Sequence, residues 1–242
     1  MAKRPVFFVQ QSSSLELPAV EVVLVDFDWY PGMAISQKQK SIDSLHYAVK
    51  KKRPCRILEI SSKSPSELGI KLSAFNLGFT HPKSKKFLSV ESAFQGSKIF
   101  ELSGPFHELY TKSANEAKKF FHDKKLGALV GFDLYGQHWP IKPMTIFYDW
   151  LYLNSVSKNP AVAKQVLEYD CFTDIEFNPK KSVNCQAYSV ALFVSLSRRG
   201  LLKQVLEDRN KFIDMLRDYP DWIESTEYAT CHQDVQKKLF EN

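Results

Sequence analysis

The sequence lacks a Cys-x-x-Cys pair, a long apolar run, an internal repeat and a low-complexity segment. Its four cysteines are widely spaced, at Cys55, Cys171, Cys185 and Cys231. Zinc sites and thiol–disulfide enzymes usually place two cysteines two residues apart, so this spacing excludes a recognisable zinc or redox motif. We expect reduced cysteines, as in a cytoplasmic protein, and no bound metal.

The apolar runs are too short for a signal peptide or a membrane span. The basic start is followed by apolar residues only at 6–9, whereas a secretory signal needs about 7–15 of them in a row. The run at 22–25 ends at Asp26, and a membrane helix needs about 20 apolar residues. The sequence therefore predicts a cytoplasmic protein with no membrane segment.

The overall composition is ordinary for a globular protein, with 44% apolar and 25% charged residues. A chain of 242 residues can form one large or two small domains with an ample core. The 33 basic residues exceed the 27 acidic ones and give a net charge of +6. This excess favours an anionic partner, either a nucleic acid or a phosphorylated small molecule.

Residues 87–101, F-L-S-V-E-S-A-F-Q-G-S-K-I-F-E, are predicted to form one helix. Ser89 can cap its start, because a serine hydroxyl accepts from the unpaired amide N–H groups of the first turn. The Gly-Pro pair at 104–105 ends it, since proline has no N–H to donate and disfavours helix in the residue before it. Apolar residues with the spacing of a buried stripe are Val90, Ala93 and Phe94.

Three polar residues share a second face of this predicted helix. Glu91, Gln95 and Lys98 follow one another at spacings of four and three residues. Because this face borders the buried stripe, we expect the carboxylate, the amide and the amine to line a pocket. The alternative is that Glu91 and Lys98 are solvated charges about two turns apart, too distant for a direct pair.

The patterning along the rest of the chain predicts an α+β fold dominated by five to eight helices around one core, with short strands contributed by the N-terminal layer. Pro143 and Pro160 are expected to open two helices, and Asn184 is expected to cap a third. Ser113 and Glu116 form a capping box. Strands are expected at 6–9, 21–27 and 55–60, and further helices at 36–49, 113–121 and 201–216.

An aromatic and basic cluster follows the second predicted strand. Within it, Trp29 and Lys38 are candidates for a substrate platform, because aromatic rings stack on bases and amines neutralise phosphate. The alternative is a solvated loop and helix start. The basic run K-K-K-R at 50–53 is open to the same two interpretations, a solvated surface or a non-specific phosphate contact.

The stretch S-V-E-S-A-F-Q-G-S-K-I-F resembles the signature T-V-E-H-Y-F-Q-A-Q-K-F of the NADAR family, the YbiA-like domains. The segment L-S-A-F-N resembles the family's L-S-N-F, with Ala74 where the family often has asparagine. The likeness spans about residues 70–205. It implies a YbiA-like helical core and three segments, namely a strand-rich layer at 1–66, a catalytic domain at 67–205 and a helical addition at 206–242.

The resemblance also implies the functional residues. It gives catalytic roles to Glu91 and Lys98, and to Asp174 in an acidic stretch that lacks the family's Trp-Gly pair. Glu176 is the second choice for the acidic role. Trp139, in the loop before the helix that Pro143 opens, is expected to stack on a base or sugar. The remaining residues expected to bind substrate are Ser73, Phe75, Asn76, Gln95, Asn184, Trp29 and Lys38.

The function implied by the resemblance is removal of ADP-ribose from guanine bases of DNA, by an antitoxin paired with a DarT-type toxin. No metal or cofactor is expected. Glu91 would stabilise the sugar cation or activate water, while Lys98 would donate a proton, hold a phosphate or form an imine with the opened ribose. Two alternatives stay open: an N-glycosidase acting on small phosphorylated ribosides, and a non-catalytic protein that binds ADP-ribose or the toxin.

Overall fold

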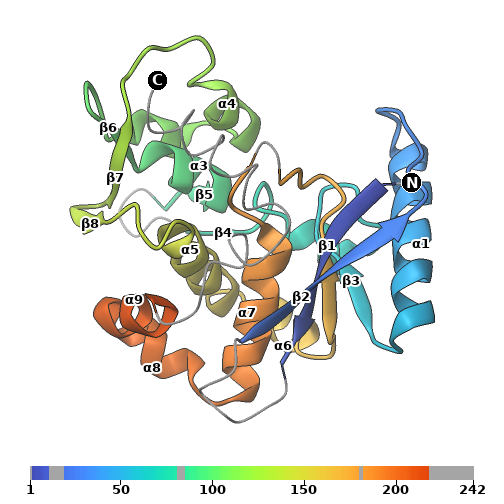
Figure 1. Cartoon of the computed structure of the whole chain (residues 1–242). Helices are drawn as coiled ribbons and strands as arrows, with labels where there is room; N and C mark the ends of the chain where they lie inside the picture. Colours follow the sequence, from blue (N-terminus) through green and yellow to red (C-terminus); the bar gives the residue numbers. More distant parts are fainter. Residues whose placement is uncertain (1, 11–18, 81–84, 180–181, 218–242) are drawn as a thin grey trace. The chain divides into compact units, whose positions relative to one another are not determined.

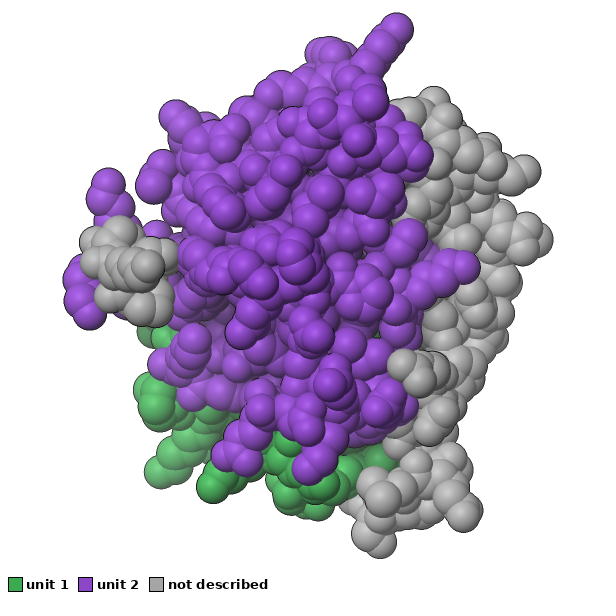
Figure 2. Space-filling view, turned by 90° about the vertical axis from the view of Figure 1, so that its left-hand side faces the viewer, with its two compact units in different colours: residues 1–76, 159–177, 185–204 green, residues 77–158, 178–184, 205–242 purple. Residues whose placement is uncertain are grey.

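The computed structural model describes residues 2–10, 19–80, 85–179 and 182–217 (Figure 1). The chain forms two compact units, coloured separately in Figure 2. Unit 1 comprises residues 1–76, 159–177 and 185–204, and unit 2 comprises residues 77–158, 178–184 and 205–242. Among the described residues about 43% are helical and 20% are in strands, which confirms the α+β class with more helix than strand.

Unit 1 is built on a four-stranded sheet in the order β2-β1-β9-β3. The long strands β1 and β2 pair along their whole length as an antiparallel hairpin, and β1 also pairs with β9 in antiparallel fashion. The short strands β3 and β9 run parallel, with Glu59 opposite Thr173. The strand bounds are Ala2–Val9 for β1, Val20–Phe27 for β2, Ile57–Glu59 for β3 and Cys171–Thr173 for β9.

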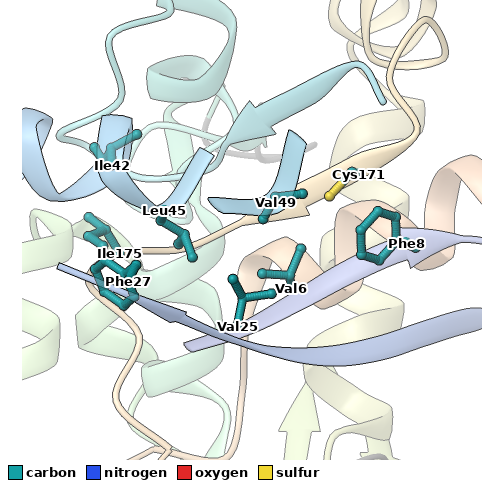
Figure 3. Packing of buried hydrophobic residues seen from close by; sticks show 9 residues of the cluster. All are labelled: Val6, Phe8, Val25, Phe27, Ile42, Leu45, Val49, Cys171 and Ile175. Atoms are coloured by element: carbon teal, nitrogen blue, oxygen red, sulfur yellow. The ribbon is translucent and has the colours of Figure 1, made fainter. Parts of the chain in front are cut away.

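Helices α1 (Ile35–Lys52) and α7 (Gln186–Arg198) lie on the two sides of this sheet (Figure 1). Because side chains alternate along a strand, Val6 and Phe8 face α1 while Phe7 packs edge-on against Tyr188 of α7, with 5.8 Å between ring centroids. Figure 3 shows the α1 side of this core, where each fully buried Val, Ile or Leu contributes about 1.5–3 kcal/mol. Two short helices complete the unit, α2 (Glu67–Lys71) and α6 (Pro160–Val166).

Unit 2 combines a two-stranded sheet, β4-β5, a three-stranded sheet, β6-β7-β8, and several helices. Helix α5 is buried on nearly all sides, and most of its residues are apolar or aromatic. The strands are β4 (Gly78–Thr80), β5 (Phe87–Ser89), β6 (Lys98–Phe100), β7 (Leu129–Leu134) and β8 (Gln137–Trp139). The helices are α3 (Val90–Gly96), η1 (His107–Thr111), α4 (Ala114–Lys119), α5 (Ile146–Ser157) and α9 (Arg209–Arg217), and α8 (Leu202–Glu207) precedes α9 along the chain.

The single helix predicted over 87–101 is wrong, because the segment forms a strand, a two-turn helix and a second strand. Ser89 caps α3 as predicted, its hydroxyl accepting from the Ser92 N–H at 3.1 Å. The helix stops at Gly96, where a Cβ atom would lie 2.5 Å from the Tyr110 ring. The following residues pair with β7 instead, so tertiary hydrogen bonds override the helical pattern.

Of the other predictions about helix starts and strand positions, some are confirmed and some are wrong. The Ser113–Glu116 capping box is present, and Pro160 opens α6. Pro143 precedes rather than opens its helix, and the cap of α7 is Cys185 instead of Asn184. Strands are not confined to the N-terminal layer, since β5 to β9 all lie beyond residue 86. The C-terminal part of the predicted helical addition, residues 218–242, lies outside the described residues.

None of the helices in the described part of the chain is long and apolar enough to cross a membrane.

Candidate functional site

Helix α3 brings Glu91 and Gln95 into direct contact in unit 2. They are one helical turn apart, and the Gln95 Nε2 donates to the Glu91 Oε1 at 2.9 Å. Each residue is only 8% exposed. The Gln95 Oε1 is buried and has no hydrogen-bond donor among the described residues. Because a buried acceptor without a partner costs about 1–3 kcal/mol, this oxygen is poised to accept from a bound molecule.

Lys98 lies at the start of β6, directly after the C-cap residue of α3, rather than on the helix. Its Nζ is 5.2 Å from the ring centroid of Phe94 and 5.1 Å from that of Phe121. Burial lowers the pKa of Lys98 to about 8, and the negative charge of Glu91 partly opposes this shift. Glu91, Gln95 and Lys98 together are called the amine cluster below.

The predicted stacking residue Trp139 lies at the end of β8, so the prediction that it occupies a loop is wrong. The residue is 3% exposed, and its ring centroid lies 5.7 Å from that of Phe147 and 4.8 Å from that of Trp150. The guanidinium of Arg209 lies 5.6 Å from the same ring. These contacts are those of a core residue, although its Nε1 has no acceptor among the described residues.

Unit 1 holds a second group of buried polar side chains at the ends of β3 and β9. Asp174 directly follows β9 and is 6% exposed, and Glu59 ends β3 and is 1% exposed. The Asp174 Oδ1 accepts from the backbone N–H groups of Glu176 and Phe177 at 3.0 and 3.1 Å. Burial, and secondarily the charge of Glu59, raises the pKa of Asp174 to about 8.

Gln186, the first residue of α7, ties this group to the segment at 72–76. Its Nε2 donates to the Ile60 carbonyl at 2.7 Å, and its Oε1 accepts from the Ala74 N–H at 2.8 Å. In the same segment, the Asn76 Nδ2 donates to the Ser73 Oγ at 3.0 Å. Ser73 is buried, Phe75 is partly buried and Asn76 is exposed.

The aromatic and basic cluster of the sequence also lies in unit 1. The Lys38 Nζ is 3.0 Å from the Glu176 Oε1 and 4.9 Å from the ring centroid of Trp29. The guanidinium of Arg4 lies 5.2 Å from the same ring. Trp29 therefore carries two cations near its ring, and Lys38 links it to the acidic stretch that follows β9. Asp174, Glu176, Lys38, Trp29 and Glu59 are called the acid cluster below.

One comparison with known families identifies the chain. The family described as the DarT1-associated NADAR antitoxin matches residues 2–224. The chain belongs to this NADAR antitoxin family. No curated protein matches the sequence.

The structure of this NADAR antitoxin thus groups most of the predicted site residues into two sets. In unit 2, Gln95 is hydrogen-bonded to Glu91, and Lys98 is close enough for the charge of Glu91 to affect its pKa. In unit 1, Lys38 lies beside Glu176 and Trp29, and the backbone N–H of Glu176 donates to Asp174. The segment with Ser73, Phe75 and Asn76 reaches the acid cluster through Gln186. Asn184 belongs to unit 2, and its buried Oδ1 has no partner among the described residues.

Sequence reasoning missed four residues of the NADAR antitoxin's acid cluster and its surroundings, namely His46, Glu59, Thr173 and Gln186. A charged residue inside the apolar run I-L-E-I was the available signal for Glu59, because a carboxylate in a buried strand needs hydrogen-bond donors. Its donors lie more than a hundred residues away along the chain. In the described part of the chain no group of three or more His, Cys, Asp or Glu residues could hold a metal ion.

Proposed function

We propose that this chain is a glycohydrolase that removes ADP-ribose from guanine bases of DNA and so counteracts a DarT1-type toxin. The observation that carries the proposal is the amine cluster, in which a buried carboxylate, an amide with an unpartnered oxygen and an amine of lowered pKa come from one short segment. The family to which the chain belongs supports the antitoxin role. A YbiA-like core remains a prediction, as do a catalytic role for Asp174 and substrate binding by Glu176, Lys38 and Trp29.

The chemistry of the reaction matches the groups of the amine cluster. Breaking a ribose C–N bond builds positive charge on the sugar and negative charge on the departing nitrogen. The Glu91 carboxylate can stabilise the sugar cation or take a proton from the attacking water. The buried acceptor of Gln95 can bind a hydroxyl or N–H of the substrate and thereby hold it beside Glu91.

Lys98 suits a step in which a proton moves or an amine attacks. With a pKa of about 8, roughly a quarter of the amine is neutral at pH 7.5, whereas a lysine in water is almost fully charged. Holding a phosphate would need only the charged form and gains nothing from a lowered pKa. We therefore propose that Lys98 either transfers a proton or forms an imine with the opened ribose.

The test starts from an oligonucleotide that carries ADP-ribose on guanine. Incubation with the purified chain is expected to release free ADP-ribose, detected by mass spectrometry. Borohydride added during turnover separates the two roles of Lys98, because it traps an imine as a stable covalent adduct. The proposal fails if no ADP-ribose is released, and a stoichiometric complex without release would identify a binding protein instead.

Variants of the amine cluster assign the activity to this site. Glu91→Gln and Lys98→Met keep the size of the side chains and are expected to abolish release while the chain stays folded. Lys119→Met alters an exposed lysine of α4 in the same unit and is the matched control. Full activity of both site variants would show that the chemistry lies elsewhere.

A further inference from the structure

Two free cysteines of unit 1, Cys55 and Cys171, are brought together by the pairing of β3 with β9. In the parallel register of these strands Ile57 lies opposite Cys171, and the Arg56 carbonyl accepts from the Cys171 N–H at 3.2 Å. Cys55 directly precedes Arg56, and its sulfur accepts a hydrogen bond from the Cys171 thiol. The strand pairing therefore holds in contact two thiols that are more than a hundred residues apart along the chain.

The two thiols differ in their access to solvent. Cys171 is fully buried, and it belongs to the apolar core between the sheet and α1 together with Phe8 and Val49 (Figure 3). Cys55 packs against this core and is only partly buried. A small solute can therefore reach Cys55, whereas the neighbours of Cys171 are all protein groups.

The surroundings also give the two thiols different reactivity, because the thiolate is the form of cysteine that attacks. The hydrogen bond from Cys171 lowers the pKa of Cys55. The positive charges of Lys50 and Arg53 act in the same direction, while burial and the charge of Asp170 oppose the shift. Burial raises the pKa of Cys171, so this thiol keeps its proton. Cys55 is thus the nucleophile of the pair, and Cys171 is the thiol that follows it.

We propose that Cys55 and Cys171 are a peroxide-sensitive thiol pair that closes reversibly as a disulfide between β9 and the segment that leads into β3. First, the Cys55 thiolate attacks hydrogen peroxide: a sulfur–oxygen bond forms, the oxygen–oxygen bond breaks, and the departing hydroxide takes up a proton and becomes water. The Cys171 sulfur then attacks the sulfur of the Cys55 sulfenic acid, and the hydroxyl group leaves with the Cys171 proton as a second water. The two thiols lose two electrons in all, which reduce one peroxide to two waters.

This inference goes beyond the proposed function and does not depend on it, because the thiol pair lies in unit 1 and its oxidation needs no substrate. A bond between Cys55 and Cys171 would close a loop of more than a hundred residues. Such a cross-link restricts the unfolded chain and thereby favours the folded one. Oxidation is therefore expected to stabilise the chain.

The test treats the full chain with hydrogen peroxide and maps its cysteines by mass spectrometry. Trypsin places the four cysteines in four different peptides, so a disulfide between Cys55 and Cys171 appears as one cross-linked pair of peptides. We expect this cross-link to form within a single chain and to disappear with dithiothreitol. The proposal is overturned if both positions remain thiols, if other cysteines are joined instead, or if the bond joins two chains.

Cysteine variants test the order of the two steps. Cys171→Ser keeps a hydrogen-bond donor but cannot form the disulfide, so the sulfenic acid of Cys55 should accumulate and react with dimedone. Cys55→Ser should leave the buried Cys171 as a thiol. Cys185→Ser alters another buried cysteine of unit 1 and is the matched control, in which the cross-link should form as in the natural chain. A folded Cys171→Ser chain without the label at Cys55 would refute the role of Cys55.

Thermal unfolding gives a second readout that peptide mapping does not. The oxidised natural chain should unfold several degrees above the reduced chain, and dithiothreitol should remove the gain. Peroxide treatment should give no such gain in Cys55→Ser. A lower unfolding temperature in the oxidised natural chain would mean that the folded structure does not accommodate the bond, and it would overturn the proposal.

Discussion

The amine cluster and the acid cluster bury ionisable groups of opposite kind, and burial moves their pKa values toward each other. Lys98 falls to about 8 and Asp174 rises to about 8, because a site with little water favours the neutral form of each. Their carboxylate neighbours act differently. Glu91 opposes burial at Lys98, whereas Glu59 adds to it at Asp174. The comparison teaches that one neighbouring charge can moderate one site and reinforce another.

The largest expected effect concerns catalysis and separates the two clusters most sharply. Glu91→Gln and Lys98→Met should each lower kcat for release of ADP-ribose by about a thousandfold, since each removes a group that acts on the reacting atoms. Glu59→Gln, which alters the acid cluster of unit 1, should lower the rate much less. Single-turnover kinetics at pH 6.5 and 8.5 would check this. An equal loss of rate in all three variants would contradict the expected difference between the amine cluster and the acid cluster.

Both clusters depend on a glycine that leaves no room for a side chain. A Cβ atom at Gly96 would meet the Tyr110 ring, and one at Gly69 would meet the Glu59 carbonyl and the Ser64 side chain. We expect Gly96→Ala and Gly69→Ala each to lower the free energy of unfolding by about 2–3 kcal/mol. Gly131→Ala, with one contact at 3.1 Å, should cost less. Urea denaturation measures all three.

The opposite pKa shifts predict opposite effects of pH on stability. Lys98 has a lower pKa in the folded chain than in the unfolded one, so its penalty is complete below pH 8 and disappears as the pH rises toward 10.5. Asp174 has a higher pKa when folded, so its penalty is absent near pH 4 and complete above pH 8. Lys98→Met should therefore stabilise most at pH 7 and Asp174→Asn most at pH 8.5, each by about 1–3 kcal/mol.

Thermal unfolding of the two variants and the natural chain at pH 5, 7 and 9 would test how the stabilisation by each variant depends on pH. The gain from Asp174→Asn should grow with pH, and the gain from Lys98→Met should shrink between pH 7 and pH 9. Gains that change in the same direction would mean that burial is not the cause of both shifts.

The smallest expected effect concerns the surface of unit 1. The last turn of α1 exposes Lys50, Lys51 and Lys52. If this surface contacts DNA, replacing all three by alanine should reduce the slope of log affinity against log salt by about 2–3. The matched triple variant of unit 2 replaces Lys112, Lys119 and Lys125, which are also exposed, and should leave the slope unchanged. Fluorescence anisotropy with a modified oligonucleotide provides the measurement.

The parts of the site that local spacing determines were predictable from the sequence. Glu91 and Gln95 are four residues apart on one helix, and their contact follows from helical geometry. Lys98 was placed on the wrong element, because the end of α3 depends on Tyr110 and on pairing with β7. Neither constraint can be deduced from the residues next to Lys98.

The acid cluster was even harder to predict from local sequence. Asp174 was chosen from a family resemblance, but Glu59 was not, because its partners Thr173 and Ile175 are 114 and 116 residues away along the chain. The α+β class, strand β2 and the second half of strand β1 were accessible from their β-branched, apolar sequences, whereas the first half of β1, A-K-R-P, gives no such signal. The sheet order was not, since it depends on a strand contributed by residues 171–173.

That sheet order has a consequence for the nascent chain during its synthesis. As the ribosome makes the chain, the hairpin of β1 and β2 is finished long before β9 exists, so one side of β1 has no strand to pair with. At common rates of translation the wait is on the order of ten to thirty seconds. During that time Phe7 and Phe8 stand beside an open edge, and a chaperone that shields such edges would help this protein to reach its folded state.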